Sequence, residues 1–328
     1  MESVFITGAT GFIGQHIALF LAEKGHCVHV LHRTSSDISG LNHPNIKLFI
    51  GDVTNSTSIE QAMKGCTGVF HIAAYAKQWG KDKDKFHKIN YEGTLNVLNV
   101  AKKQNIQKAV FTSTAGVIGP STSKELVDEN TIRTVDFFFD YEKTKWMAEE
   151  KIQEFVKNGM DISIVSPTRV YGPGLLSESN GVTTMINQYY LGKWHMLPGN
   201  GKKIGNYVFV DDVVKGHYLA YTKGGAGERY ILGGTNISYI DFFKNLNAVI
   251  NSKYYLIKVP AFVIRIVAAI NMLICYTTGK APFITPSSAR KFLFDWNVSS
   301  HKATKHLSYN PISLSEGLQK TINWLKES

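Results

Sequence analysis

The stretch Val4-Phe5-Ile6-Thr7-Gly8-Ala9-Thr10-Gly11-Phe12-Ile13-Gly14 decides the fold of this chain. Its apolar run ending in Thr-Gly predicts a buried strand, and the apolar positions that recur at helical spacing from Phe12 onward predict a helix. The turn between them is glycine-spaced, so backbone N–H groups can approach a ligand closely and the positive end of the helix points at it. This combination predicts a pyrophosphate site, although the spacing is G-x-x-G-x-x-G and differs from the strict G-x-G-x-x-G fingerprint.

Strands and helices alternate through the first third of the chain. Apolar runs predict further strands at 27–31, 46–50, 68–72 and 109–111. Five strands separated by helices predict an α/β fold with a doubly wound parallel sheet, the Rossmann fold. Ligands of such sheets bind at the carboxyl ends of the strands, where the residues discussed below lie.

The pattern changes after residue 171, and this change predicts a second unit. Residues 1–171 are expected to form the NAD(P)-binding domain, and 206–232 to return the chain to the main sheet. This return includes a strand at 206–210, followed by an N-cap at Asp211 or Asp212. Segments 172–205 and 233–328 are expected to form a smaller, mostly helical substrate-binding lobe.

Composition narrows the class of protein. Of the 328 residues, 44% are hydrophobic and 19% are charged, which is ordinary for a soluble globular protein. The three cysteines show no C-x-x-C spacing, so we predict neither a disulfide framework nor a metal site. Few cysteines and the lack of an apolar leader before the first strand predict a cytoplasmic protein.

The net charge of +10 is concentrated toward the C-terminus. From Asn251 onward there are ten Lys/Arg against three Asp/Glu. These basic residues are dispersed, whereas a nucleic-acid interface would need them clustered with aromatic residues on one face. We therefore expect no nucleic-acid partner. Membrane lipid, an anionic substrate and simple solubility all remain open as reasons for the charge.

Arg33 lies where an acidic residue would hold the ribose 2′-hydroxyl in a dinucleotide fold, about 20 residues after the glycines. An arginine at this place suits a 2′-phosphate, so the sequence favours NADP(H), with NAD(H) as the alternative. Asp37 follows closely and could instead bind the ribose. A solvated surface arginine is the other interpretation of Arg33.

Tyr141 and Lys145 lie four residues apart at the start of a long helical pattern, hence on one helical face. The Tyr-x-x-x-Lys pattern alone is weak, because the chain also has it at Tyr189, Tyr254 and Tyr276. Context distinguishes the first copy. It follows the fifth strand and a hydroxyl cluster that includes Ser113 and Thr114.

Together these motifs resemble those of the extended short-chain dehydrogenase/reductase family, over most of the chain. The match is closest to the dihydroflavonol-4-reductase-like branch, which also holds cinnamoyl-CoA reductases and hydroxysteroid dehydrogenases. Each motif is weak alone, and their common order is specific. The shared motifs are Gly8-x-x-Gly11-x-x-Gly14, Gly51-Asp52-Val53, His71-Ile72-Ala73-Ala74, Asn90-x-x-Gly93-Thr94, Thr112-Ser113-Thr114-Ala115, Tyr141-x-x-x-Lys145, 167–174 and 209–213.

The resemblance implies a set of site residues. Thr114 stands where the family has its catalytic serine and keeps the hydroxyl, while Ser113 is the neighbour with which that position could be confused. Asn90 is implied as a backbone or water-relay anchor, the alternative being a polar residue inside a helix. The implied cofactor-binding residues are Thr7, Gly8, Gly11, Phe12, Ile13, Gly14, Arg33, Asp52, Val53, Ala73, Ala74, Tyr141, Lys145 and Pro167.

The chemistry implied by the resemblance is hydride transfer between a nicotinamide and a carbonyl, which leaves an alkoxide in need of a proton. Tyr141 is expected to supply that proton. The Lys145 ammonium stabilises the phenolate, lowers the tyrosine pKa and bonds the nicotinamide ribose. Thr114 is expected to hold the substrate oxygen.

Three function classes follow. The first is an oxidoreductase for the carbonyl or secondary alcohol of a small, fairly apolar substrate. The second is a nucleotide-sugar epimerase or dehydratase that retains NAD, and the third is a non-catalytic dinucleotide-binding protein. The intact Thr114, Tyr141 and Lys145 argue against the third, and Arg33 favours the first over the second.

Two apolar segments have more than one interpretation. Residues 260–276 are short for a bilayer span and contain Arg265 and Asn271. We expect them to pack within the lobe, the alternative being a surface for a lipid-like substrate or peripheral membrane contact. Phe137-Phe138-Phe139 either lines an apolar substrate pocket or belongs to the core. A homodimer is a further candidate assembly.

Overall fold

The computed structural model describes residues 2–121, 125–252 and 254–327. Seven strands form one sheet in which every adjacent pair is parallel. In spatial order the strands are β10 (Arg229–Leu232), β6 (Ile162–Pro167), β5 (Lys108–Thr112), β4 (Gly68–His71), β1 (Ser3–Thr7), β2 (Cys27–His32) and β3 (Ile46–Ile50).

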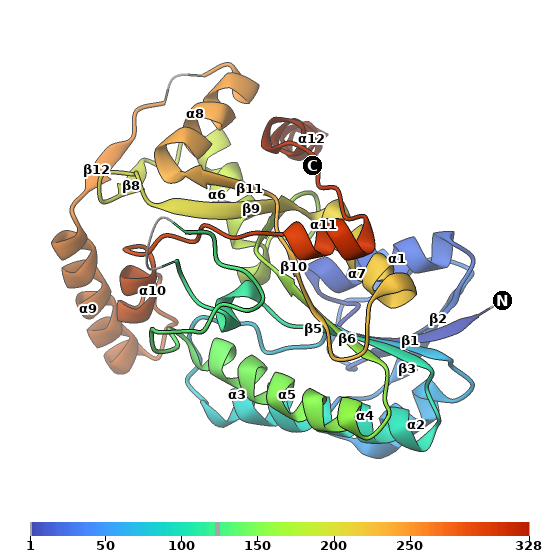
Figure 1. Ribbon diagram of the computed structural model, residues 1–328. Coiled ribbons are helices and arrows are strands. Elements are labelled where there is room, and N and C mark those ends of the chain that lie inside the picture. Colours follow the sequence, from blue (N-terminus) through green and yellow to red (C-terminus); the bar gives the residue numbers. More distant parts are fainter. Residues whose placement is uncertain (1, 122–124, 253, 328) are drawn as a thin grey trace.

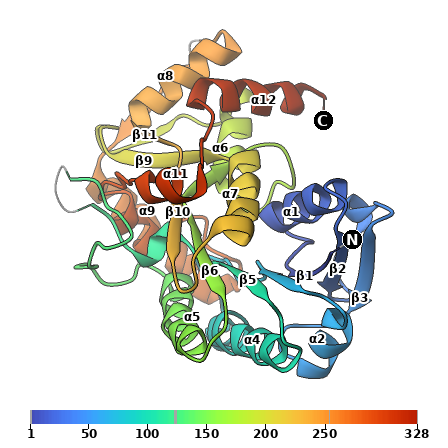
Figure 2. The ribbon, with the colours of Figure 1, turned by 45° about the vertical axis from the view of Figure 1, so that its right-hand side comes forward.

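Helices cover both faces of this sheet (Figures 1 and 2). One face packs against α1 (Phe12–Glu23), α7 (Val210–Lys223) and α11 (His301–Leu307). The other face packs against α2 (Ser56–Met63), α4 (Gly93–Lys103) and α5 (Asp140–Lys157). The doubly wound parallel sheet predicted from the sequence is therefore confirmed.

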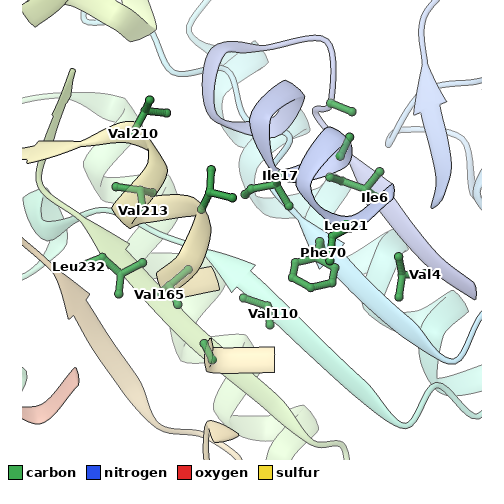
Figure 3. Close-up of a cluster of buried hydrophobic side chains, with 14 of the residues drawn as sticks. Val4, Ile6, Ile17, Leu21, Phe70, Val110, Val165, Val210, Val213 and Leu232 are labelled. Atoms are coloured by element: carbon green, nitrogen blue, oxygen red, sulfur yellow. The ribbon is translucent and has the colours of Figure 1, made fainter. Parts of the chain in front are cut away.

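Alternation along the strands divides the core into two layers. Val4 and Ile6 point to the α1 side, where Figure 3 shows them with Ile17 and Leu21 of α1, while Phe5 belongs to the cluster on the opposite face. All three strand residues are fully buried. Because neighbouring strand side chains point to opposite faces, a central strand covered on both sides is apolar throughout.

The order of the strands reverses beside β1. The chain goes from β1 to β2 and β3 on one side, then crosses to β4 on the other. The carboxyl ends of β1 and β4 therefore border the crevice where doubly wound sheets bind their ligands.

The strand expected to return to the main sheet at 206–210 lies elsewhere. It is β9 (Ile204–Phe209), which pairs with β7 (Arg169–Tyr171) and β11 (Thr235–Ser238) in a separate three-stranded sheet. β10 is the strand that returns the chain to the main sheet, through its pairing with β6.

The predicted N-cap at Asp211 or Asp212 is also wrong. Phe209 is the N-cap of α7, and both aspartates lie in the first helical turn, where a negative charge favours the helix dipole. Asp212 is buried, and its carboxylate accepts a hydrogen bond from the Ile312 backbone N–H at 2.9 Å.

A second group of elements surrounds its own apolar cluster. This cluster contains Tyr171, Tyr189, Tyr207, Phe242 and Leu318, among others. The elements of the group are α6 (Gly181–Tyr190), β8 (Met196–Pro198), α8 (Tyr239–Ile250), β12 (Ile257–Val259), α9 (Ala261–Thr278), α10 (Pro286–Lys291) and α12 (Leu314–Glu327). The domain boundaries proposed above stay a prediction.

Helix α9, which contains most of the apolar segment 260–276, packs against the rest of the protein with one face only. This face contacts α10 through Ile264, Ala268 and Ala289, but only 17% of the helix is buried. Among the described residues, α9 is the single helix whose length and hydropathy would suit a membrane span. The expectation that this segment packs within the lobe holds for one of its faces.

Candidate active site

The glycine turn is packed so closely that two of its glycines cannot carry a side chain. Gly8 has a φ of +79°, and a Cβ there would lie 2.6 Å from the backbone nitrogen of Ala73, just after β4. A Cβ on Gly14 would lie 2.1 Å from the Gly8 carbonyl oxygen. Gly11 is exposed and is the N-cap of α1, so no side chain caps the first N–H groups of the helix. These N–H groups, with no acidic residue in the first turn, are available to an anion.

A buried histidine holds the strand ends beneath this turn. Thr94 donates its hydroxyl proton to the Asn90 carbonyl, so it accepts a hydrogen bond from Nε2 of His71 at 2.9 Å. Nδ1 of His71 then accepts from the Thr7 hydroxyl at 2.7 Å, and Thr7 accepts from the Ala73 N–H at 3.2 Å. Burial lowers the pKa of His71 to about 3, helped by the charge of Lys145. The ring is therefore neutral at physiological pH.

The other predicted cofactor residues lie at neighbouring strand ends. Arg33 follows β2 and is exposed. Asp37, its rival for the ribose, accepts the Ser39 N–H at 2.9 Å, a bond that lowers the pKa of Asp37. The Asp52 carboxylate after β3 accepts the N–H and hydroxyl of Thr54.

The remaining positions complete that edge of the sheet. Val53 is buried, and Ala73 and Ala74 are half-buried after β4. Phe12, Ile13 and Gly14 form the first turn of α1, and Pro167 ends β6. The parallel sheet therefore brings the predicted cofactor residues to one edge.

Thr114 and Ser113 point to different places. Ser113 is buried and donates its hydroxyl to the carboxylate of Glu149 on α5. Thr114 is half-buried and lines a cavity of about 60 Å³ together with Pro167, Arg169, Lys291 and Trp296, among others. Its hydroxyl oxygen accepts the Gly116 N–H at 3.1 Å, which leaves its proton available to a ligand. This geometry favours Thr114 over Ser113 as the catalytic hydroxyl.

Tyr141 lies in the first turn of α5, half-buried against Phe138, Phe139 and Trp296. Phe138 and Phe139 of the aromatic run therefore pack as core and support the tyrosine ring, whereas Phe137 is half-buried against Arg133 and Trp146. Burial raises the pKa of Tyr141, and the carboxylates of Glu142 and Glu149 raise it further. In the unliganded site this hydroxyl is therefore protonated at physiological pH.

Lys145 lies one turn further along α5 and is fully buried. Its Nζ is 3.9 Å from the centroid of the Phe111 ring and has no hydrogen-bond partner within the described residues. Burial lowers the pKa of Lys145 to about 7, against the opposing effect of the Glu149 carboxylate. A buried donor left without a partner costs free energy, so this nitrogen is suited to a bound ligand.

Asn90 is an anchor between two segments. It is fully buried in a π-helical turn, Lys88–Glu92, which follows the short helix α3 (Asp84–His87) and precedes α4. Its side-chain oxygen accepts the Tyr75 N–H at 2.6 Å, and its Nδ2 donates to the Thr144 hydroxyl at 3.0 Å. π-Helical turns occur often at functional sites. This one ties the loop after β4 to α5, one residue before Lys145.

Glu142 is a site residue that sequence reasoning missed. It is buried next to Tyr141, accepts the Phe138 N–H at 3.0 Å, and pairs with Lys291 of α10 at 2.8 Å. Arg133 also approaches it, at 3.4 Å. The only local signal was its place beside Tyr141, because Lys291 lies 149 residues away in the sequence.

The arrangement fits a dinucleotide. The glycine turn offers backbone N–H groups at the switch point of the sheet, and Lys145 offers a buried, unpartnered ammonium beyond it. Thr114 is the N-cap of η3 (Ala115–Val117), which lines the cavity and packs against α5, the helix of Tyr141. A larger surface hollow contains none of these groups and is lined by Asn247, Ala248, Asn251, Ser252, Tyr254 and Tyr255.

Comparison with known proteins agrees with this geometry. Residues 4–233 match the model of the NAD dependent epimerase/dehydratase family. The dihydroflavonol 4-reductase of Gerbera hybrida is 31% identical over 70% of this chain and 67% of its own length. The mouse sterol-4-alpha-carboxylate 3-dehydrogenase, decarboxylating, is 26% identical over 97% of this chain and 89% of its own.

The fold is shared with solved structures as well. The UDP-glucose 4-epimerase of Thermotoga maritima, 23% identical, superposes with a TM-score of 0.82 and covers 99% of both chains. The resemblance to the extended short-chain dehydrogenases and reductases is therefore confirmed. The chain belongs to the NAD dependent epimerase/dehydratase family, a family of NAD-dependent enzymes whose members similar to this chain include named reductases and dehydrogenases.

Proposed function

We propose that this protein is an oxidoreductase that transfers a hydride between NADP(H) and the carbonyl or secondary alcohol of a small, largely apolar substrate. The observation that carries the proposal is that Thr114 lines a cavity and caps the η3 turn, which packs against α5, the helix that carries Tyr141 and Lys145. The Gerbera and mouse relatives support it, because they are named as a reductase and a dehydrogenase.

Each side chain has a defined part in this reaction. The bound nicotinamide supplies or accepts the hydride. When a carbonyl is reduced, negative charge develops on its oxygen, and Tyr141 donates a proton to that atom. The Thr114 hydroxyl donates a hydrogen bond to the same oxygen and orients it. Lys145 bonds the cofactor ribose, and in its charged form it is expected to oppose the burial and the two carboxylates that raise the pKa of Tyr141.

The apolar substrate class follows from the walls of the cavity. Trp296 and Val298 line it, and Phe138 and Phe139 pack behind Trp296. Two cations also line it, but each has partners of its own. Lys291 pairs with Glu142, and Arg169 donates to the hydroxyls of Tyr207 and Tyr239. Thr168 and Asn206 line the cavity too, and the Thr168 hydroxyl donates to Asn206. These polar groups are therefore engaged within the wall, and Pro167, Trp296 and Val298 offer the apolar contacts.

A net redox reaction distinguishes this proposal from an epimerase that regenerates its cofactor. We expect purified protein to consume NADPH in step with an added aliphatic or aromatic ketone, measured by loss of the near-ultraviolet absorbance of the reduced nicotinamide. UDP-glucose should cause no turnover. Interconversion of sugar nucleotides without net NADPH consumption would overturn the proposal in favour of the epimerase function that the family name and the Thermotoga structure represent.

The cofactor preference rests on Arg33. Its guanidinium is exposed at the end of β2, whereas Asp37 is engaged by Ser39. A 2′-phosphate bound by an exposed arginine gains a charge-assisted hydrogen bond, so we expect NADPH to bind several-fold or more tightly than NADH.

Fluorescence titration of both cofactors against wild type and Arg33→Ala measures this preference. The alanine variant should lose affinity for NADPH and keep its affinity for NADH. Lys64→Ala, on an exposed lysine after α2, is the control for general loss of positive charge. Equal affinities in wild type would refute the NADP(H) assignment without touching the catalytic one.

A further inference from the structure

An exposed apolar surface lies on α9 and beside it. Phe262 is 64% exposed, Leu273 is 65% exposed and Tyr255 is 87% exposed. We call this surface the α9 patch, and it consists of Phe262, Ile266, Val267, Ile270, Leu273, Ile274 and Tyr276 of α9 with Tyr255, Ile257 and Phe283. In Figure 1, α9 lies at the outer edge of the molecule, with α10 on its inner side.

The two faces of α9 have different surroundings. Ile264, Ala268 and Cys275 are buried, and they recur at spacings of four and seven on the α10 side. Phe262, Ile266 and Ile270 recur at spacings of four on the opposite side and are exposed. A surface helix normally presents polar residues to water, whereas the exposed face of α9 is apolar. An exposed apolar surface of this kind is typical of an interaction site.

The charges around the α9 patch indicate which kind of partner it binds. Between Asp241 and Asp295 the sequence has seven Lys/Arg and no Asp/Glu. Lys258 precedes α9, Arg265 lies on it and Lys280 follows its end, and all three are exposed. A second copy would place this all-basic segment against itself, because a two-fold contact uses the same surface from both subunits. A surface of anionic phosphates matches both the apolar face and its basic border.

We propose that this protein binds anionic membrane surfaces through the α9 patch, with α9 lying in the plane of the lipid headgroups. The 18 residues of α9 span about 27 Å, which is near the lower limit for crossing a bilayer core of roughly 30 Å, so length alone does not decide between crossing the bilayer and lying in its surface. The inner face of α9 stays packed on α10, and Ser288 of α10 in turn donates a hydrogen bond to Gln78. The helix therefore enters the boundary between headgroups and acyl chains without leaving the fold.

Vesicle co-sedimentation of the full-length protein tests this proposal. Wild type should sediment with vesicles that contain phosphatidylglycerol and much less with pure phosphatidylcholine, and added salt should weaken binding. Lys258→Gln, Arg265→Gln and Lys280→Gln together should weaken it roughly 100-fold, from about 1 kcal/mol for each basic residue near the surface. Lys64, Lys102 and Lys157, exposed elsewhere and changed to Gln together, are the charge control.

A second variant tests the apolar contact. Ile266→Gln, Ile270→Gln and Leu273→Gln together should abolish sedimentation, with unchanged thermal unfolding because the three side chains are at least half exposed. Leu48→Gln, Leu126→Gln and Ile132→Gln are the matched exposed control. No vesicle binding by wild type would overturn the proposal, as would a dimer that only the α9 variant dissociates. Binding that resists high salt and alkaline carbonate would overturn the in-plane placement.

Discussion

Replacement of Tyr141 by Phe should lower turnover roughly 10²–10⁴-fold, which is the usual contribution of a positioned general acid. The substitution removes one oxygen and leaves the ring packed against Phe138, Phe139 and Trp296. The fold and NADPH affinity should therefore persist. Steady-state kinetics with any accepted carbonyl measure the effect, and circular dichroism with cofactor titration establishes that the variant is folded and binds.

The chain offers matched controls for this prediction in its other Tyr-x-x-x-Lys pairs. Tyr276 is 77% exposed on α9, and Tyr189 is buried with its hydroxyl donating to Asn247 at 2.8 Å. Tyr254→Phe is the third control. Tyr189→Phe should cost about 1 kcal/mol of stability from the lost hydrogen bond, without a comparable effect on turnover. A control that costs as much as Tyr141→Phe would show that the catalytic residue is misplaced.

Replacement of Lys145 by Met should damage activity and improve stability in the same protein. Loss of the ammonium removes the charge that lowers the pKa of Tyr141, so turnover should fall. It also removes a charged hydrogen bond to the cofactor, worth about 1.5–3 kcal/mol, or roughly 10–150-fold in affinity. Kinetics and NADPH titration measure both losses. Lys143→Met, on an exposed lysine of the same helix, should show neither loss.

The stability gain should depend on pH. The pKa of Lys145 falls from 10.5 to about 7 on folding, because the buried site disfavours the ammonium. The unfolded chain then binds more protons between these two pH values, so wild-type stability rises with pH across that window. Lys145→Met should therefore be most stabilising below pH 7, by at most about 4–5 kcal/mol, and its advantage should vanish above pH 10.5.

Chemical denaturation of the apoprotein at several pH values measures this difference. If the protein is less stable with lysine than with methionine at this position, the lysine serves function, since sites of catalysis commonly trade stability for activity. If Lys145→Met destabilises the protein at neutral pH, then the buried ammonium has a structural partner. The argument that this group is left unpaired to bind the cofactor would then be wrong.

The features predictable from sequence are those encoded within a few residues of one another. The glycine turn at Gly8–Gly14 and the Tyr141/Lys145 face depend on local spacing, and each strand reveals itself by an apolar run. The sheet to which a strand belongs cannot be predicted in this way. The apolar run at 206–210 predicts a strand, but its partners β7 and β11 depend on contacts that no local pattern carries. β10 is only four residues long, too short for its apolar residues to stand out from the rest of the segment.

Several details of the site could not be predicted, because they too depend on contacts between distant segments. Ser113 and Thr114 are adjacent hydroxyls, and only the distant Glu149 shows which of them is engaged in the core. Glu142 would look like an exposed helical glutamate without Arg133 and Lys291, which come from other segments. The anchoring role of Asn90 has no local sequence signature, because its side chain bonds to Tyr75 and Thr144, which are 15 and 54 residues away.

The pairing of β10 with β6 has a consequence for how the chain can be made and divided. All six residues of β6 are buried, and Arg229–Leu232 pairs with its outer side. Until those residues leave the ribosome, β6 is an unprotected sheet edge with a row of unpaired backbone groups. A fragment ending at residue 171 would keep that edge permanently and tend to self-associate. Residues 1–171 are therefore not expected to fold as an independent unit. Their sheet is completed only by β10, which is synthesised after β7, β9 and α7.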